Sequence, residues 1–336
     1  MTLEEFLLQW NSDSPYITIH TSGTTGIPKS MEVEKECMRV SARITCQFLH
    51  LKPGDTALLC LPLDYIAGKM MVVRALVARL HLLHVQPSSH PLASLFSPES
   101  KSTAIDFAAM IPMQVAHSLE NPKEKEILQN IKHLIIGGGS IDTSLENSLK
   151  EFPNSIWSTY GMTETLSHIA LRRINGDNAS SWYTPFDHVS VSLDRSHCLV
   201  VQANGICNEP LCTHDIAEIH PDGRRFRIIG RIDNVVCSGG IKIHMEEVEN
   251  KLAPFLLAPF LITKTSDPIW GECVTLLSTN DNMEEIKEIC RNHLPKHWIP
   301  KRYYTIPAIP FTSTGKIARK EAIRIAEKCM RNNTFS

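Results

Sequence analysis

A nine-residue run of hydroxyl residues, glycines and one lysine constrains the fold more than any other stretch of the chain. Residues 16–19 are all aromatic or β-branched, which predicts a strand, and residues 21–29 then read Thr-Ser-Gly-Thr-Thr-Gly-Ile-Pro-Lys. Glycines allow backbone N–H groups to close on an anion, hydroxyls donate to its oxygens, and lysine adds a positive charge. Pro28 stands where a Walker A loop needs glycine, and a flexible surface turn is the alternative to a phosphate loop. The residues expected to bind phosphate are Thr21, Ser22, Gly23, Thr24, Thr25, Gly26 and Lys29.

Apolar runs of strand length alternate with helical patterns in the first half of the chain. Strands are predicted at 57–61, 81–85, 103–110 and 131–136, and helices at 37–49 and 66–80. Strands that alternate with helices form a largely parallel sheet, and ligands bind at the carboxyl ends of its strands. A strand-rich segment follows at 172–211. We therefore expect an α/β fold, with a large domain over residues 1–230 and a small α+β domain over residues 231–336.

The charge and cysteine content argue against several functional classes. Lys and Arg total 34 against 36 Asp and Glu, a net charge of −2, which gives no electrostatic reason for binding nucleic acid or a membrane surface. The ten cysteines form no C-x-x-C pair, so we expect free thiols in a reducing cytoplasm. The first ten residues lack the basic start of a signal peptide, and no apolar run reaches membrane length. The sequence predicts a cytoplasmic protein without membrane insertion.

A second segment is suited to bind a nucleotide. Residues 158–165 read Ser-Thr-Tyr-Gly-Met-Thr-Glu-Thr. An aromatic residue beside a glycine, such as Tyr160, can stack on a purine that the backbone approaches closely. A carboxylate such as Glu164 can hold Mg²⁺ against triphosphate oxygens. Taken alone, the segment could also be a strand end with a solvated glutamate.

Five motifs in sequence order resemble those of the adenylate-forming superfamily, which includes acyl- and aryl-CoA ligases, luciferases and peptide-synthetase adenylation domains. The motifs lie at residues 21–29, 158–165, 211–215, 230–243 and 310–319. The resemblance implies an enzyme that uses ATP, Mg²⁺ and coenzyme A to convert a small-molecule carboxylic acid into a thioester through an acyl-adenylate.

The resemblance also implies a role for each matched residue around the nucleotide. Tyr160 is expected against adenine, Thr163 at the α-phosphate, and Glu164 on Mg²⁺. Gly138, in the glycine turn at 137–139, is expected to line the nucleotide pocket. That turn also has the Gly-Gly-x-Ser order of a carrier-domain attachment site, but carrier domains are separate helical bundles.

The later motifs supply the ribose site, the hinge and the catalytic lysine of the family. Asp215 is expected to accept both ribose hydroxyls, although His214 replaces the glycine that usually precedes it. Arg231 is expected to bind ribose or phosphate, Asp233 to act as the hinge, and Lys316 to be the adenylation lysine. The alternatives are a turn aspartate at 215 and an ordinary exposed lysine at 316. The tunnel for coenzyme A is expected at Ser238, Gly239 and Gly240.

More narrowly, three segments resemble the o-succinylbenzoate–CoA ligases of menaquinone synthesis. Residues 61–68 correspond to a Leu-Pro-Leu-Phe-His motif, with Tyr65 in the histidine position, and residues 161–168 resemble an extended Gly-Met-Thr-Glu-Thr-x-Ser-(Gln/His) signature. Arg74 matches an arginine that these ligases place near the carboxylates of the acid, although a solvated helix face is the alternative for it. The substrate residues implied are Arg74, Tyr65 and Ser167.

One departure from the family is large, because only 20 residues precede the phosphate loop in this sequence, so we expect most of the usual first subdomain to be absent. We expect that an uncovered apolar sheet face would need another cover, for which a homodimer is one option. Three alternatives stay open: another aryl- or acyl-CoA ligase, an amino-acid adenylation domain that loads a carrier protein, and an inactive nucleotide-binding remnant.

Overall fold

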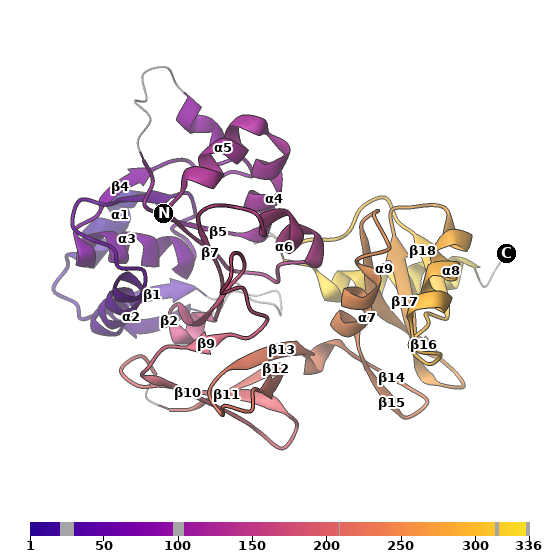
Figure 1. Ribbon diagram of the computed structural model, residues 1–336. Coiled ribbons are helices and arrows are strands. Elements are labelled where there is room, and N and C mark those ends of the chain that lie inside the picture. Colours follow the sequence, from indigo (N-terminus) through magenta and orange to yellow (C-terminus); the bar gives the residue numbers. More distant parts are fainter. Residues whose placement is uncertain (21–29, 97–103, 208, 313–315, 334–336) are drawn as a thin grey trace.

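The computed structural model describes residues 1–20, 30–96, 104–207, 209–312 and 316–333, and Figure 1 shows a larger N-terminal part beside a smaller C-terminal part. The larger part is built around a seven-stranded sheet in the order β4-β3-β5-β6-β7-β8-β9. Its strands are β3 (Thr56–Leu59), β4 (His81–His84), β5 (Phe107–Met110), β6 (His133–Ile136), β7 (Ser155–Gly161), β8 (His168–Arg173) and β9 (Thr184–Pro185).

The strands from β4 to β7 are parallel, whereas β8 and β9 pair antiparallel at one edge. All residues of β3 and β5 are buried, as strands covered on both faces require. The strand order is that of a doubly wound sheet whose ligand crevice lies beyond the carboxyl ends of the strands. The predicted nucleotide residues Gly138 and Tyr160 lie at the ends of β6 and β7. The predicted α/β class with a largely parallel sheet is confirmed.

Helices cover both faces of this sheet. Neighbouring strand residues point to opposite faces, so Leu59 packs toward α3 while Leu58 packs toward α4 and α5. On the first face α3 lies on the sheet, and α2 and α1 pack over it. The helices are α1 (Leu3–Trp10), α2 (Lys35–Phe48) and α3 (Ile66–Ala78) on this face, and α4 (Pro112–Glu120), α5 (Pro122–Asn130) and α6 (Thr143–Leu149) on the other, with the 3₁₀ turn η1 (Ala93–Phe96).

The expected uncovered sheet face is therefore not found in the part of the chain that the structure describes. Every residue of α3 from Gly68 to Ala75 is buried, and the cover comes from α1 and α2 of the same chain. A homodimer stays a prediction, but the apolar face that motivated it is already packed.

The strand before the phosphate run is present, but it pairs outside the main sheet. β1 (Tyr16–His20) forms an antiparallel ladder with β2 (Ser30–Glu34), a strand that the sequence analysis did not predict. One isolated bridge joins His20 to Tyr65, next to the start of α3. The seven predicted phosphate-loop residues between β1 and β2 lie outside the described residues.

A four-stranded antiparallel sheet and the smaller part complete the chain. The first sheet has the order β10-β11-β12-β13, and the smaller part contains a five-stranded sheet formed by β14 to β18. In the smaller part α7 and α8 pack on one face of the sheet, and α9 packs on the other. The elements are β10 (Val189–Leu193), β11 (Cys198–Ala203), β12 (Leu211–Ile219), β13 (Phe226–Arg231), η3 (Ile232–Asn234), β14 (Val235–Ser238), β15 (Ile241–His244), α7 (Met245–Leu252), β16 (Phe260–Asp267), β17 (Gly271–Ser278), α8 (Met283–His293), β18 (Arg302–Thr305) and α9 (Arg319–Asn333).

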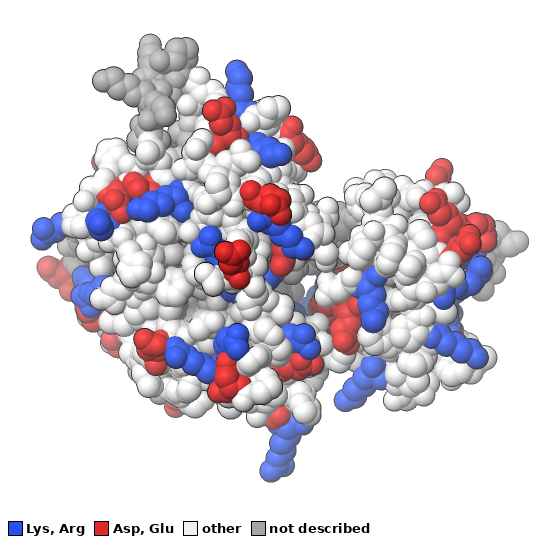
Figure 2. Space-filling view, in the orientation of Figure 1, with Lys and Arg blue, Asp and Glu red and all other residues white. Residues whose placement is uncertain are grey.

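Charges of both signs are interspersed over the described part of the face drawn in Figure 2. This view shows no basic stripe, in keeping with the net charge of −2. Such a face gives no electrostatic reason for binding a polyanion. Among the described helices, none has the length and apolar character needed to span a bilayer.

Candidate active site

The turn that follows β7 is held by a glycine and a buried threonine. A Cβ on Gly161 would lie 2.3 Å from the carbonyl oxygen of Ser167 and 2.5 Å from Cα of His168, so only glycine lets these two segments meet. Thr165 is fully buried, and its Oγ1 donates to the carbonyl oxygen of Ser167 at 2.7 Å. The turn thereby leaves Ser167 half-buried, while Glu164, two residues after Met162, is exposed.

Asp215 lies between Tyr160 and Arg231. The hydroxyl of Tyr160 donates to Oδ2 of Asp215 at 2.7 Å, and Nη1 of Arg231 donates to Oδ1 at 2.7 Å. Burial, together with the charge of Asp215, raises the pKa of Tyr160, so its hydroxyl remains a donor. Each carboxylate oxygen keeps a further lone pair, and two ribose hydroxyls need two such acceptors.

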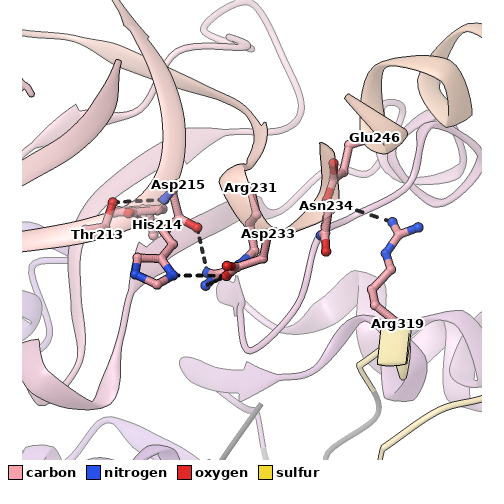
Figure 3. A network of polar contacts seen from close by, with 9 residues as sticks. Thr213, His214, Asp215, Arg231, Asp233, Asn234, Glu246 and Arg319 are labelled. Atoms are coloured by element: carbon pink, nitrogen blue, oxygen red, sulfur yellow. Dashed lines mark hydrogen bonds and ion pairs between the residues drawn. The ribbon is translucent and has the colours of Figure 1, made fainter. Parts of the chain in front are cut away.

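His214 contacts the residue predicted to be the hinge. Nδ1 of His214 lies 3.0 Å from Oδ2 of Asp233, and Nη2 of Arg231 lies 3.3 Å from the same oxygen (Figure 3). Burial opposes ionisation of Asp233, but His214 and Arg231 outweigh it and hold the pKa of this carboxyl below its usual range. The histidine that replaces the family's glycine thus bonds to the hinge candidate, and Asp215 still pairs with Arg231.

The ammonium of Lys316 lies within electrostatic range of three predicted site residues. Burial lowers the pKa of Lys316, the charge of Arg231 lowers it further, and Asp215 and Glu164 oppose the change. The structure therefore brings the predicted adenylation lysine to the residues predicted for ribose and Mg²⁺. The three residues before it, 313–315, lie outside the described residues.

A cluster of charged groups holds the start of α9, three residues after Lys316. Arg319 donates to both carboxylate oxygens of Glu249 at 2.6 Å, and its Nη2 lies 3.9 Å from Glu246. Glu246 in turn accepts a hydrogen bond from Asn234, the last residue of η3 (Figure 3). The cluster therefore connects the turn that contains the hinge candidate to the base of the lysine loop.

On the opposite side of the turn after β7, α3 presents a buried guanidinium to Ser167. Arg74 is only 2% exposed, and its Nη2 donates to Oγ of Ser167 at 2.5 Å. Nη1 contacts the sulfur of Met71 at 3.8 Å, and Nε has no partner among the described residues. Burial lowers the pKa of Arg74 to about 10, so the group is still cationic at neutral pH. Within the described ranges no carboxylate forms an ion pair with it.

Two further residues of this region lie apart from Arg74. Lys69 is fully buried and donates from Nζ to the carbonyl oxygen of Thr18 at 3.1 Å, toward β1. Tyr65 caps the N-terminus of α3, nine residues before Arg74, which is about 13 Å along a helix axis. The structure thus brings Arg74 and Ser167 together, whereas a substrate role for Tyr65 stays a prediction.

The predicted coenzyme A residues form the tip of the β14–β15 hairpin. Gly239 and Gly240 have φ values of +56° and +82°, in the left-handed region that glycine adopts most easily, and Ser238 ends β14. A Cβ on Gly239 would lie 2.5 Å from the ring of Trp270. Figure 1 shows the hairpin extending away from β7. Lys316, and not this tip, therefore lies near the residues predicted to bind the nucleotide.

The chemistry of the acidic residues fits a magnesium ion that arrives with a nucleotide. Glu164 lies in the 3₁₀ turn η2 (Thr163–Thr165), and its exposed carboxylate forms no hydrogen bond or ion pair with another described residue. Within the same ranges no group of three or more His, Cys, Asp or Glu residues could form a complete cage for a metal. Mg²⁺ in nucleotide sites commonly takes one or two protein carboxylates and fills its shell with phosphate oxygens and water. Thr163, predicted at the α-phosphate, is the neighbour of Glu164.

Sequence reasoning missed two residues that join this site. Nδ1 of His168 lies 3.3 Å from Oγ of Ser167, and Nε2 lies 3.1 Å from Oγ1 of Thr45 on α2. His168 belonged to a recognised signature, but nothing in the signature assigned it a role. Thr45 is 123 residues away, and no spacing in the sequence marks it.

Comparison with known proteins defines the class. A model of the family described as "AMP-binding enzyme" matches residues 6–201, more than half of the chain. The chain belongs to this family of adenylate-forming enzymes, and it is an ATP-dependent AMP-forming ligase of the acyl-CoA synthetase type.

Three relatives describe the similarity more closely. A 2-succinylbenzoate–CoA ligase of Staphylococcus epidermidis is 24% identical over 341 residues, which cover 93% of this chain and 70% of the relative. An acyl-CoA synthetase (AMP-forming)/AMP-acid ligase II-like protein of Dyadobacter fermentans is 31% identical, with a TM-score of 0.64 and coverage of 96% of this chain and 93% of its own. An o-succinylbenzoate coenzyme A synthetase of Bacillus subtilis, in complex with ATP and magnesium ion, is 19% identical, with a TM-score of 0.73 and coverage of 90% and 69%.

Proposed function

We propose that this enzyme is an o-succinylbenzoate–CoA ligase of menaquinone biosynthesis that acts through an acyl-adenylate. The observation that carries the proposal is Arg74, a buried cation that contacts Ser167 and has no carboxylate partner among the described residues. An unpaired charge in a dry site is costly, and a second carboxylate on the substrate would compensate it. The names of the bacterial relatives support the same acid.

In the first half-reaction a carboxylate oxygen of the acid bonds to the α-phosphorus of ATP. The bond from this phosphorus to the bridging oxygen breaks, and pyrophosphate leaves. The ammonium of Lys316 and the hydroxyl of Thr163 would stabilise charge on the phosphoryl oxygens, while Asp215 holds the ribose. Mg²⁺ on Glu164, when bound, would neutralise part of the triphosphate charge.

In the second half-reaction the thiolate of coenzyme A attacks the acyl carbon of the mixed anhydride, and AMP leaves. We propose that residues 231–336 rotate as a domain against residues 1–230, with Asp233 as the hinge. Support comes from the strands on either side of η3, which belong to different sheets. The rotation would withdraw Lys316 and bring the tip at Ser238, Gly239 and Gly240 to the site. This is a gating step between two chemistries.

The test varies both the side chain at position 74 and the carboxylic acid that is supplied as substrate. Wild type, Arg74→Leu and Arg74→Lys are compared with o-succinylbenzoate and with 3-benzoylpropionate, which keeps the reacting chain and lacks the ring carboxylate. Leucine should reduce kcat/KM for the diacid by about 2–5 kcal/mol, the usual cost of removing one partner of a buried charge pair. Lysine should lose less, because it keeps the charge without the guanidinium fork.

The monoacid should be affected far less by either variant. Equal losses for the two acids, or no loss, would reject Arg74 as the specificity residue. The general ligase assignment would remain, and another aryl- or acyl-CoA ligase would then be the better description.

A further inference from the structure

A hydrogen-bonded chain of side chains runs from Thr45 on α2 through His168 and the half-buried Ser167 to Arg74. Thr45 and His168 are buried, and Ser41 is 2% exposed. The hydroxyl of Thr45 donates to the carbonyl oxygen of Ser41 at 3.2 Å, so its single proton is used. Oγ1 of Thr45 must therefore accept the contact at 3.1 Å from His168, and Nε2 of His168 must have the proton.

The other ring nitrogen of His168 then accepts a hydrogen bond. Burial, and secondly the charge of Arg74, lower the pKa of His168 well below its usual value, so the ring is neutral and Nδ1 has no proton. Oγ of Ser167 consequently donates to Nδ1 at 3.3 Å. Its lone pairs remain for Nη2 of Arg74, which donates at 2.5 Å.

This arrangement decides what Ser167 and Arg74 can offer a ligand. The hydroxyl proton of Ser167 is directed at His168, so Ser167 has no proton to give to a carboxylate. The donors that remain are on Arg74, whose Nε has no partner among the described residues. With the opposite tautomer of His168, Ser167 would accept hydrogen bonds from both Nδ1–H of His168 and Nη2 of Arg74, and its own proton would be free to donate to a ligand.

We propose that His168 and Thr45 are positioning residues, which hold Ser167 as an acceptor and so orient Arg74 toward the distal anionic group of the acid. The inference rests on the proposed function and refines it, because Ser167 becomes a support for Arg74 rather than a donor to the substrate. The reacting carboxylate is at the other end of the acid, so the effect belongs in the KM of the diacid more than in kcat.

Matched variants of the full chain test the proposal. His168→Leu removes both hydrogen bonds, whereas His168→Gln can accept with Oε1 and donate with Nε2. Thr45→Val removes the acceptor of Nε2–H, whereas Thr45→Ser keeps it. For Leu and Val we expect the KM of o-succinylbenzoate to rise roughly tenfold or more, as expected for hydrogen bonds to charged groups, with a much smaller change for 3-benzoylpropionate. The variants His168→Gln and Thr45→Ser should keep most of the preference for the diacid.

The outcomes separate this inference from the proposed function. If wild type does not prefer the diacid, the proposed function fails. If wild type prefers it and His168→Leu keeps that preference, or if His168→Gln is as impaired as His168→Leu, the positioning role is wrong.

A neutral His168 also predicts that the diacid KM of wild type follows the same profile between pH 6 and 8 as that of His168→Gln. A titration present only in wild type would overturn the neutral state of His168 on which the assignment of its protons rests. Equal losses for both acids would show a structural role alone.

Discussion

Arg74 is a residue whose charge the described chain does not neutralise. Its Nη2 has the oxygen of Ser167, Nη1 has only a sulfur at 3.8 Å, and Nε has nothing within the described ranges. Burial depresses the pKa of Arg74, but only to about 10, so the side chain keeps its charge at neutral pH and the cost of burying that charge remains. A group in this state favours an anionic ligand, because the ligand removes a penalty that the free protein already carries.

The burial of His168 predicts how the stability of the protein should depend on pH. Its pKa is lowered by burial and by Arg74, so below the ordinary value of 6.5 the unfolded chain binds a proton that the folded chain does not. The free energy of unfolding should therefore fall as pH decreases below 6.5, by up to about 1.4 kcal/mol per pH unit from this group. Above that pH the contribution should be constant. Urea unfolding of wild type and His168→Gln from pH 5 to 8 measures the difference, which removes the effect of other histidines.

Equal pH slopes in the two proteins would contradict a neutral, buried His168. A wild type that becomes more stable at low pH relative to His168→Gln would show that the folded ring is protonated.

At the scale of elements, η3, α7 and α9 form the connection between the hinge candidate and Lys316. Asn234 bonds to Glu246 on α7, and Arg319 at the start of α9 bonds to Glu249 on the same helix. These groups are partly buried, and their ion pairs connect the start of α9 to α7. This explains how one short lysine loop can be placed at residues that belong to the larger part of the chain.

Replacement of Lys316 should separate the two half-reactions. We expect Lys316→Ala to reduce acyl-adenylate formation by at least about 10²-fold, because a charge directed at the transition state is lost. Thioester formation from supplied acyl-adenylate should be nearly unaffected, since Lys316 would then be withdrawn. Single-turnover assays of each half-reaction measure this, with the exposed Lys320→Ala as the control. A parallel loss in both half-reactions would argue against the two-orientation account.

A proline at the hinge candidate should trap one orientation. Asp233 lies in a 3₁₀ turn, whose φ is compatible with the value that proline imposes. Asp233→Pro should keep adenylation, because Lys316 lies near the predicted nucleotide residues in this conformation, and it should lose transfer to coenzyme A. Asp233→Ala removes the contacts to His214 and Arg231 without fixing φ, and it should retain both steps. Normal overall turnover in the proline variant would remove Asp233 as the hinge.

At the scale of the whole molecule, local pattern predicted most elements of the larger sheet. The buried runs of β3, β5 and β6 and the apolar neighbours of Arg74 on α3 are visible in one stretch of sequence each. β2 was missed because only two of its five residues, Met31 and Val33, are apolar, and its pairing with β1 leaves no local signal in the sequence. The cover of the sheet by α1 and α2 was missed because helix packing leaves no local signal.

In the candidate site, too, some features could be predicted from local sequence and others could not. Residues within one motif, such as Tyr160 and Glu164, could be predicted from order and spacing. The bonds from Tyr160 to Asp215 and from His168 to Thr45 join residues 55 and 123 positions apart, and only the fold brings them together. His214 was visible as a departure from a motif, but its contact with Asp233 follows from the pairing of β12 with β13 and the turn that comes next.

The most direct test of the proposed function is pyrophosphate release from ATP by the purified chain, over a panel of carboxylic acids that includes o-succinylbenzoate and 3-benzoylpropionate. Without coenzyme A, o-succinylbenzoate should give a burst close to one equivalent of enzyme, because the acyl-adenylate stays bound. With coenzyme A, release should continue and the thioester should accumulate in equal amount. Release that is no faster with o-succinylbenzoate than with the monoacid, or release without thioester in the presence of coenzyme A, would contradict the account.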